Sequence, residues 1–125
     1  MPEAASKSDA VVGVDLGGTK IFAGVFNGAL ECIGTSRIST KAQRGPDAVI
    51  DRIERCIRDA IDEADLTLKQ VAAVGIGAPG AVNSKEGMVI FAPNLDGWKE
   101  IPLRKALEKR LEIPVRVEND ANIAV

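Results

Sequence analysis

The chain has 125 residues, enough for one domain with a hydrophobic core, and its 46% hydrophobic and 27% charged content is typical of globular proteins. A net charge of −2, three phenylalanines, one tryptophan and no long apolar run argue against binding to nucleic acid and against a membrane span. There is no histidine, which excludes Ser-His-Asp triads and His-based metal sites within the chain. Cys32 and Cys56 lack C-x-x-C spacing. They are predicted to be small, buried, reduced thiols of a cytoplasmic protein.

A glycine turn near the start of the chain is the first feature with chemical potential. Residues 1–9 are polar and predicted to form a flexible tail, before a domain that covers residues 10–125. Two strand-like runs, 10–15 and 21–26, flank the sequence Asp15-Leu16-Gly17-Gly18-Thr19-Lys20. We expect a β-hairpin in which the glycines allow a sharp turn with positive φ. The N–H groups of such a turn can bind a phosphate, and the Asp15 carboxylate can hold a hydrated Mg²⁺.

This turn differs from two common nucleotide-binding loops. A P-loop needs the pattern G-x-x-x-x-G-K-[ST] before a helix, and a dinucleotide-binding loop also leads into a helix. Here Lys20 is followed by Ile21 and a β-branched, aromatic segment. A phosphate turn between two strands resembles instead the sugar kinases, heat-shock ATPases and actin. The alternative is a hairpin that uses glycine for shape alone, with Lys20 as a surface cation.

A third strand and a long helix follow. Asn27-Gly28 predicts a second hairpin turn, and the third strand covers roughly residues 30–40. Gly45-Pro46-Asp47 predicts the start of a helix that ends near residue 64. Apolar residues recur along this helix at three- and four-residue steps and predict a face that packs on a sheet. The opposite face is expected to carry the ion pairs Asp51–Arg55 and Glu54–Arg58.

Residues 71–76 form a continuous apolar run, as expected of a buried central strand, and lead into a second glycine motif. The motif at residues 75–80, GIGAPG, matches G-x-G-x-x-G literally. Residues 81–87 have no helical pattern, which excludes a dinucleotide site, and a strand resumes at Met88. A glycine–proline turn at the carboxyl end of a buried strand is nevertheless a common ligand position in open α/β sheets.

The last third of the chain predicts a loop, a helix, a strand and the start of another helix. In the loop, Asn94 and Trp98 are expected to pack rather than to bind a ligand. A helix is predicted over residues 103–111 and a strand over 114–118, which runs into Asn119-Asp120-Ala121-Asn122. Three hairpin-joined strands followed by strand–helix units predict an α/β fold: a ribonuclease H-like (actin-like ATPase) domain with a mixed sheet and helices on its faces.

These motifs can meet at one sheet edge. If the first strand and the two later strands are parallel, their carboxyl ends lie together. Phosphoryl transfer needs a phosphate cradle, a metal and a carboxylate that accepts the proton of the attacking hydroxyl. Asp15 and Gly17–Lys20 can supply the first two and Asp120 the third, while Asn119 offers a donor and an acceptor to sugar hydroxyls. The alternative for Asn119-Asp120 is a helix N-cap.

Four motifs, in order, resemble the ROK family of repressors, open reading frames and sugar kinases. They are DLGGTK at 15–20, GIGAPG at 75–80, APNLD with the following tryptophan at 92–98, and ENDAN at 118–122. The resemblance spans residues 11–125. It implies the N-terminal lobe of an ATP-dependent hexose kinase similar to glucokinases, which convert ATP and D-glucose to ADP and glucose 6-phosphate in glycolysis.

The resemblance also implies roles for individual residues. Asp120 is the base that deprotonates the sugar 6-hydroxyl, and Asn119 and the Gly80 backbone contact the sugar. Gly17–Lys20 lie against the ATP phosphates, in the form typical of ATP-using rather than polyphosphate-using members. Mg²⁺ is expected at Asp15, through water.

The resemblance finally implies that part of the enzyme is missing. Family kinases are bilobal, and their second half supplies a Glu/His sugar-binding pair, a Cys/His structural zinc site and the adenosine pocket. We therefore expect this chain to be inactive alone. Family repressors carry a helix-turn-helix before the DLGGTK motif, where this chain has a short polar tail, which favours the kinase branch. A sugar-sensing repressor lobe and a stand-alone interaction domain, such as a homo-oligomer, are the alternatives.

Overall fold

The structure is a computed structural model that describes residues 10–123. The predicted tail at residues 1–9 lies outside the described residues.

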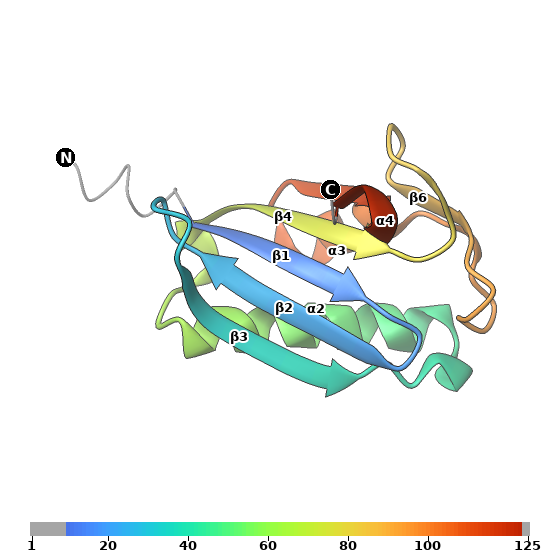
Figure 1. Cartoon of the computed structure of the whole chain (residues 1–125), viewed down its shortest axis with the longest axis horizontal. Coiled ribbons are helices and arrows are strands. Elements are labelled where there is room, and N and C mark those ends of the chain that lie inside the picture. Colours follow the sequence, from blue (N-terminus) through green and yellow to red (C-terminus); the bar gives the residue numbers. More distant parts are fainter. Residues whose placement is uncertain (1–9, 124–125) are drawn as a thin grey trace.

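A five-stranded mixed sheet forms the centre of the molecule (Figure 1). Its strands, in the spatial order β3-β2-β1-β4-β8, are β3 (Cys32–Ser39), β2 (Lys20–Phe26), β1 (Ala10–Leu16), β4 (Val71–Ala78) and β8 (Val115–Asn119). The β1–β2 and β2–β3 pairs are antiparallel, and the β1–β4 and β4–β8 pairs are parallel. The predicted antiparallel meander and the mixed sheet are therefore confirmed.

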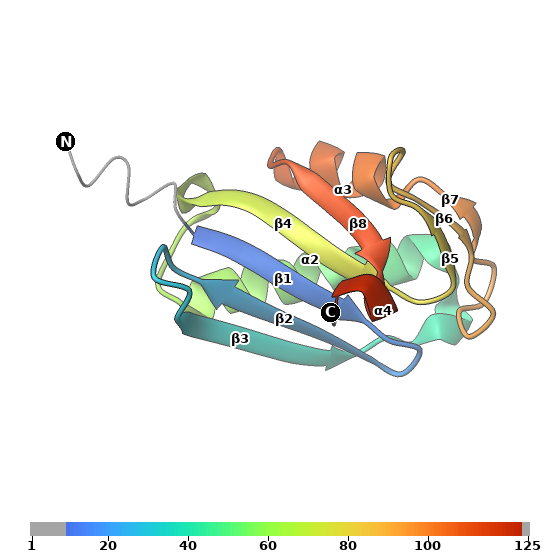
Figure 2. The ribbon, with the colours of Figure 1, turned by 45° about the horizontal axis from the view of Figure 1, so that its top comes forward.

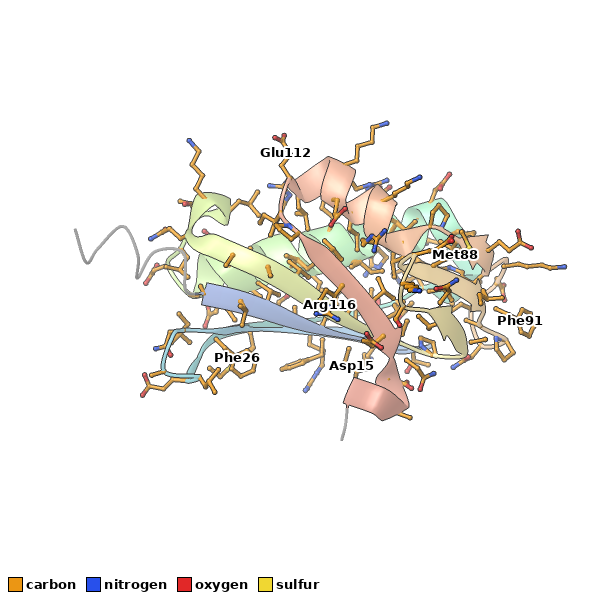
Figure 3. All side chains as sticks on the ribbon, turned by 90° about the horizontal axis from the view of Figure 1, so that it is seen from above. Asp15, Phe26, Met88, Phe91, Glu112 and Arg116 are labelled. Atoms are coloured by element: carbon orange, nitrogen blue, oxygen red, sulfur yellow. The ribbon has the colours of Figure 1, made fainter. Side chains whose placement is uncertain are left out.

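Helices lie on both faces of this sheet. The helices α2 (Pro46–Glu63) and α3 (Leu103–Leu111) cover one face, and the short α4 (Asp120–Ile123) lies on the other (Figures 2 and 3). Short 3₁₀ turns, η1 (Ala42–Arg44) and η2 (Leu68–Gln70), flank α2. No helix within residues 10–123 is long and apolar enough to cross a membrane.

A second, three-stranded antiparallel sheet was only partly foreseen. It consists of β5 (Ala81–Asn83), β6 (Met88–Phe91) and β7 (Lys99–Ile101) in that order. The sequence predicted a strand at β6 but not β5 or β7, since three residues are too few to display an alternation.

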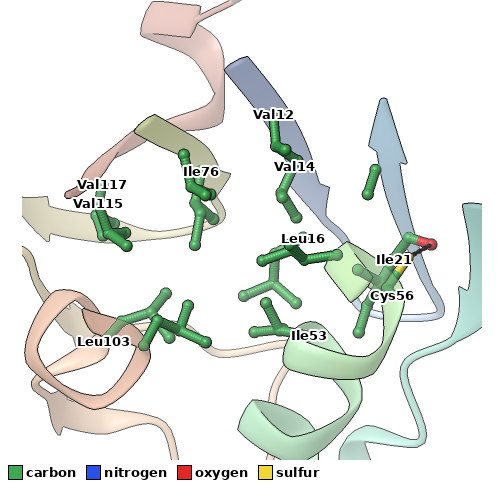
Figure 4. Packing of buried hydrophobic residues seen from close by; sticks show 14 of the residues in the cluster. Val12, Val14, Leu16, Ile21, Ile53, Cys56, Ile76, Leu103, Val115 and Val117 are labelled. Carbon is green, nitrogen blue, oxygen red and sulfur yellow. Dashed lines mark hydrogen bonds between the residues drawn. The ribbon is translucent and has the colours of Figure 1, made fainter. Parts of the chain in front are cut away.

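The hydrophobic core lies between the main sheet and the α2–α3 layer (Figure 4). Alternate residues of β1, among them Val12, Val14 and Leu16, are buried there because successive strand residues point to opposite faces. Ile53 of α2 lies beside Leu16, and Leu103 of α3 lies on the side of Val115 and Val117 of β8. Cys56 is buried in this core as predicted, whereas Cys32 is exposed, so that prediction was wrong. Cys32 begins β3, the edge strand of the sheet, where little covers it.

The charged face of α2 pairs only partly as predicted. Glu54 and Arg58 form the expected ion pair at 2.9 Å. The prediction of an Asp51–Arg55 pair was wrong, because the Arg110 side chain of α3 binds both Asp51 and Glu54. Tertiary packing thus redirects Asp51 from its own helix and joins α2 to α3.

The buried thiol gives a prediction about pH and reactivity. Burial raises the pKa of the Cys56 thiol above its ordinary value, although its Sγ lies 3.4 Å from the Ser36 carbonyl oxygen. The folded state therefore keeps this proton to higher pH than the unfolded chain. Its contribution to stability is complete below the free-cysteine pKa of about 8.5 and is lost as pH rises through the native pKa.

We expect one thiol, Cys32, to react with Ellman's reagent at pH 8 in the native protein and two to react in denaturant. Cys32→Ser should leave no rapidly reacting native thiol. Chemical denaturation should show stability falling above pH 9, and Cys56→Ala should flatten that part of the profile. Rapid native labelling of Cys56 would contradict the burial.

Candidate functional site at the carboxyl edge of the sheet

The parallel strands bring the predicted motifs to one edge of the sheet. Asp15 of β1 lies opposite Gly77 of β4, which lies opposite Glu118 of β8. Ala78 pairs in turn with Asn119. The loops that follow the three strands therefore leave the sheet side by side, which confirms the predicted convergence.

Asp15 also lies on the face of the sheet where the last helix begins. Val14 and Leu16 point into the core beneath α2 and α3, so Asp15 points to the opposite side and is exposed. Figure 3 shows α4 on the side opposite α3, and Asp120, also exposed, is its first residue. Asp15 and Asp120 thus lie at the same edge of the sheet, and α4 lies on the face to which Asp15 points.

The glycine turn between β1 and β2 closes as a tight hairpin, but not with the predicted backbone conformation. The Gly17 N–H donates to the Lys20 carbonyl oxygen at 2.9 Å. Neither Gly17 nor Gly18 has a positive φ, so that expectation was wrong. Close approach by neighbouring atoms instead leaves little room for a side chain at either glycine. A Cβ on Gly17 would lie 3.0 Å from the Lys20 carbonyl oxygen, and a Cβ on Gly18 would lie 3.3 Å from the Asn94 side chain.

Thr40, which the sequence did not single out, holds this turn in place. It is fully buried, donates its hydroxyl to the Gly17 carbonyl oxygen at 2.8 Å and donates its N–H to the Thr19 carbonyl oxygen at 2.8 Å. The preceding residue, Ser39, is anchored to α2, because the Arg52 Nε donates to its carbonyl oxygen at 2.6 Å. A threonine at the end of an edge strand carries no local signal of this role.

Two donors remain available on the turn. The backbone N–H groups of Gly18 and Thr19 make no hydrogen bond with another residue of the described part of the chain. Lys20, the next residue, is exposed at the start of β2. A turn with free N–H groups beside an ammonium is suited to an anion with several oxygens, such as a phosphate.

Asn119 connects the second glycine motif to the last helix. Its Nδ2 donates to the Gly80 carbonyl oxygen at 2.5 Å, and its Oδ1 accepts the N–H of Ala121 at 2.9 Å. The second bond is an N-cap of α4, so this alternative interpretation of Asn119 is confirmed. Capping leaves Asp120 as the first residue of the helix, at the edge shared with the turn.

The loop between β6 and β7 completes the edge. Trp98 is 1% exposed, as expected for a packing residue. Asn94, in contrast, is exposed and lies against Gly18 of the turn. The sequence predicted that both residues pack within the loop, because no local pattern indicates that this loop contacts the turn at Gly18.

Most ligands of a metal ion at this edge would be waters or phosphate oxygens and not protein side chains. Within residues 10–123, no group of three or more His, Cys, Asp and Glu side chains is placed to hold a metal ion. Asp15 therefore belongs to no ready-made cluster of three protein ligands. That donor set fits Mg²⁺, which keeps waters and binds phosphate oxygens, better than an ion enclosed by protein ligands.

Comparison with known proteins places this arrangement among known folds. The profile of the ROK family matches residues 11–125. The chain is 42% identical over 113 residues to a glucokinase from Streptomyces coelicolor, an overlap that covers 90% of this chain and 33% of that protein. It is 32% identical over 112 residues to a putative xylose repressor from a Caldicellulosiruptor species, covering 90% of this chain and 28% of the repressor.

A solved structure matches the fold. The crystal structure of a ROK family glucokinase from Streptomyces griseus, in complex with glucose and AMPPNP, superimposes with a TM-score of 0.81 at 40% identity. The match covers 92% of this chain and 34% of that one, so the chain spans about a third of the length of its relatives. The actin-like ATPase fold class expected from the sequence is confirmed.

Proposed function

This chain belongs to the ROK family, and from that membership we propose that it is the N-terminal lobe of an ATP-dependent hexose kinase. The reaction proposed is that of glucokinase, transfer of the terminal phosphoryl group of ATP to the 6-hydroxyl of D-glucose. The observation that carries the proposal is the shared edge, where the turn with the free N–H groups of Gly18 and Thr19 follows β1 and the exposed Asp120 follows β8. The glucose and AMPPNP in the Streptomyces griseus structure support it.

In this proposal each group at the edge has one task. The Gly17–Lys20 turn binds the ATP phosphates with backbone N–H groups and the Lys20 ammonium. Asp120 accepts the proton of the sugar hydroxyl as that oxygen attacks phosphorus. Asn119 and the Gly80 backbone orient the sugar, and their mutual hydrogen bond supports this because it fixes one against the other. Asp15 would hold Mg²⁺ through water, and the ion would supply charge neutralisation at the phosphates.

A reassembly experiment tests the proposal. Because the chain spans about a third of its relatives, we expect the isolated chain to release little or no ADP from ATP. Mixing it with a separately produced C-terminal lobe of the Streptomyces coelicolor glucokinase should give ADP release that depends on glucose. A coupled ADP assay measures this, with each lobe alone and the mixture without glucose as controls. A stable complex without glucose-dependent turnover would contradict the proposal.

The second candidate is the sugar-sensing lobe of a ROK-type repressor, favoured by the similarity to the putative xylose repressor. This function needs sugar binding without a base, so it predicts sugar affinity that is unaffected by Asp120→Asn and no ADP release.

The kinase proposal also includes a cytoplasmic location, where ATP and reduced cysteines occur together. It further includes assembly of the protein into homo-oligomers.

A further inference from the structure

The loop at residues 92–98 presents Asn94 on a fixed support. The Ala92 N–H donates to the Trp98 carbonyl oxygen at 3.0 Å, and the Trp98 N–H donates to the Leu95 carbonyl oxygen at 3.2 Å. Ala92, Leu95 and Trp98 are all buried. Asn94 lies between these anchors and is exposed, so its position is set by the loop and not by its own side chain.

Asn94 lies directly beside the glycine turn between β1 and β2. A Cβ on Gly18 would lie 3.3 Å from both Cβ and Nδ2 of Asn94, and 3.4 Å from its carbonyl oxygen. The Asn94 amide makes no hydrogen bond with any other residue in the described range. A neutral side-chain donor therefore lies next to Gly18, whose N–H is free.

We propose that Asn94 is a phosphate-binding residue whose Nδ2 donates to an oxygen of the phosphate chain that the Gly18–Thr19 turn holds. This inference rests on the proposed function, since it assigns a third donor to the same site. A phosphoryl group in transfer spreads its charge over several oxygens, and a donor fixed before the reaction stabilises that charge without reorganisation. If Asn94 only packed against Gly18, its exposed amide would stay bonded to water when a phosphate binds.

An NMR titration of this chain tests the inference without requiring catalysis. Pyrophosphate, and separately Mg²⁺ with ATP, is added to ¹⁵N-labelled protein. The side-chain amide pair of Asn94 and the backbone amides of Gly18 and Thr19 should shift together and report one affinity. The side-chain amide of Asn83, which lies in β5 and whose Oδ1 accepts the Glu86 N–H, should not shift.

Three variants separate a donor from a packing residue. Asn94→Leu keeps the size and removes the donor, and pyrophosphate affinity should fall about 10-fold. Asn94→Asp keeps the shape and adds a negative charge, and the loss should exceed 10-fold. Asn83→Asp adds the same charge elsewhere and retains the acceptor, so its affinity should stay within about 2-fold of the parent. Unfolding midpoints of all three should match the parent because both asparagines lie at the surface or half-buried.

Each result has one meaning. Shifts at Gly18 and Thr19 without a shift at Asn94, together with normal affinity of Asn94→Leu, would overturn the Asn94 assignment and leave the proposed kinase function standing. No shift at the turn amides with either ligand would overturn the phosphate site itself, and with it both the proposed function and this inference.

Discussion

Replacing Asp120 with asparagine is expected to lower glucose-dependent ADP release by about 10²–10⁴-fold in the reassembled enzyme, which is the range that a positioned general base contributes. The asparagine amide has nearly the same shape but cannot accept the hydroxyl proton. Since Asp120 is exposed and is the first residue of α4, loss of its charge there should cost at most about 1 kcal/mol, and the fold should be unchanged. The turnover number should carry the loss, while the KM for glucose changes little.

The chain contains a matched control for this variant. Asp47 lies in the first turn of α2, so Asp47→Asn makes the same chemical change at another helix start. Its activity should remain within about 2-fold of the parent, and circular dichroism should show equal helix content in both variants. Normal turnover by the Asp120→Asn enzyme would reject Asp120 as the base.

Gly80→Ala is expected to cost more than about 2 kcal/mol of unfolding free energy. A Cβ at this position would lie 2.1 Å from the Phe91 carbonyl oxygen and 2.9 Å from the Ala92 Cα, both of which belong to the backbone. The φ of Gly80 is also 83°, a conformation that alanine adopts only with strain. Urea denaturation measures the change, and loosening of the Gly80–Asn119 hydrogen bond should weaken sugar binding as well.

Two other glycines separate the causes of that loss. Gly45 has a φ of 93° but nothing within 4 Å of an added Cβ, so Gly45→Ala should cost only about 1 kcal/mol from backbone strain. Gly75 has neither a positive φ nor a neighbour within 4 Å, and Gly75→Ala should be close to neutral. If Gly80→Ala were no worse than Gly45→Ala, the close approach to Phe91 would not persist in solution.

Much of the fold follows from local patterns in the chain. The helix at residues 103–111 has the predicted bounds, because its apolar spacing and the preceding proline are both local signals. The convergence of Asp15 with the region before Asp120 was also foreseen, since it depends only on parallel strands ending at one edge. The strand after residue 71 runs two residues longer than predicted, through Gly77 and Ala78, because glycine and alanine carry little strand signal.

The site depended more on contacts between distant segments, which no local pattern reports. The limited space at Gly18 comes from Asn94, and the support of the turn comes from Thr40, both far along the chain. Asp51 pairs with Arg110 and not with Arg55 for the same reason. The residues with the proposed chemistry were therefore predictable from motif and order, whereas the residues that hold them were not.

The hydrogen bonds from Thr40 have a consequence for the order of folding. The first two strands alone can close their hairpin through Gly17 and Lys20, but the carbonyl groups of the turn acquire their partner only when the third strand adds to the edge and Arg52 of α2 fixes Ser39. During synthesis, a nascent chain that ends before Ser39 would have the glycine motif without the hydrogen bonds that hold its turn. The proposed phosphate affinity should therefore develop late in folding, together with the docking of the long helix.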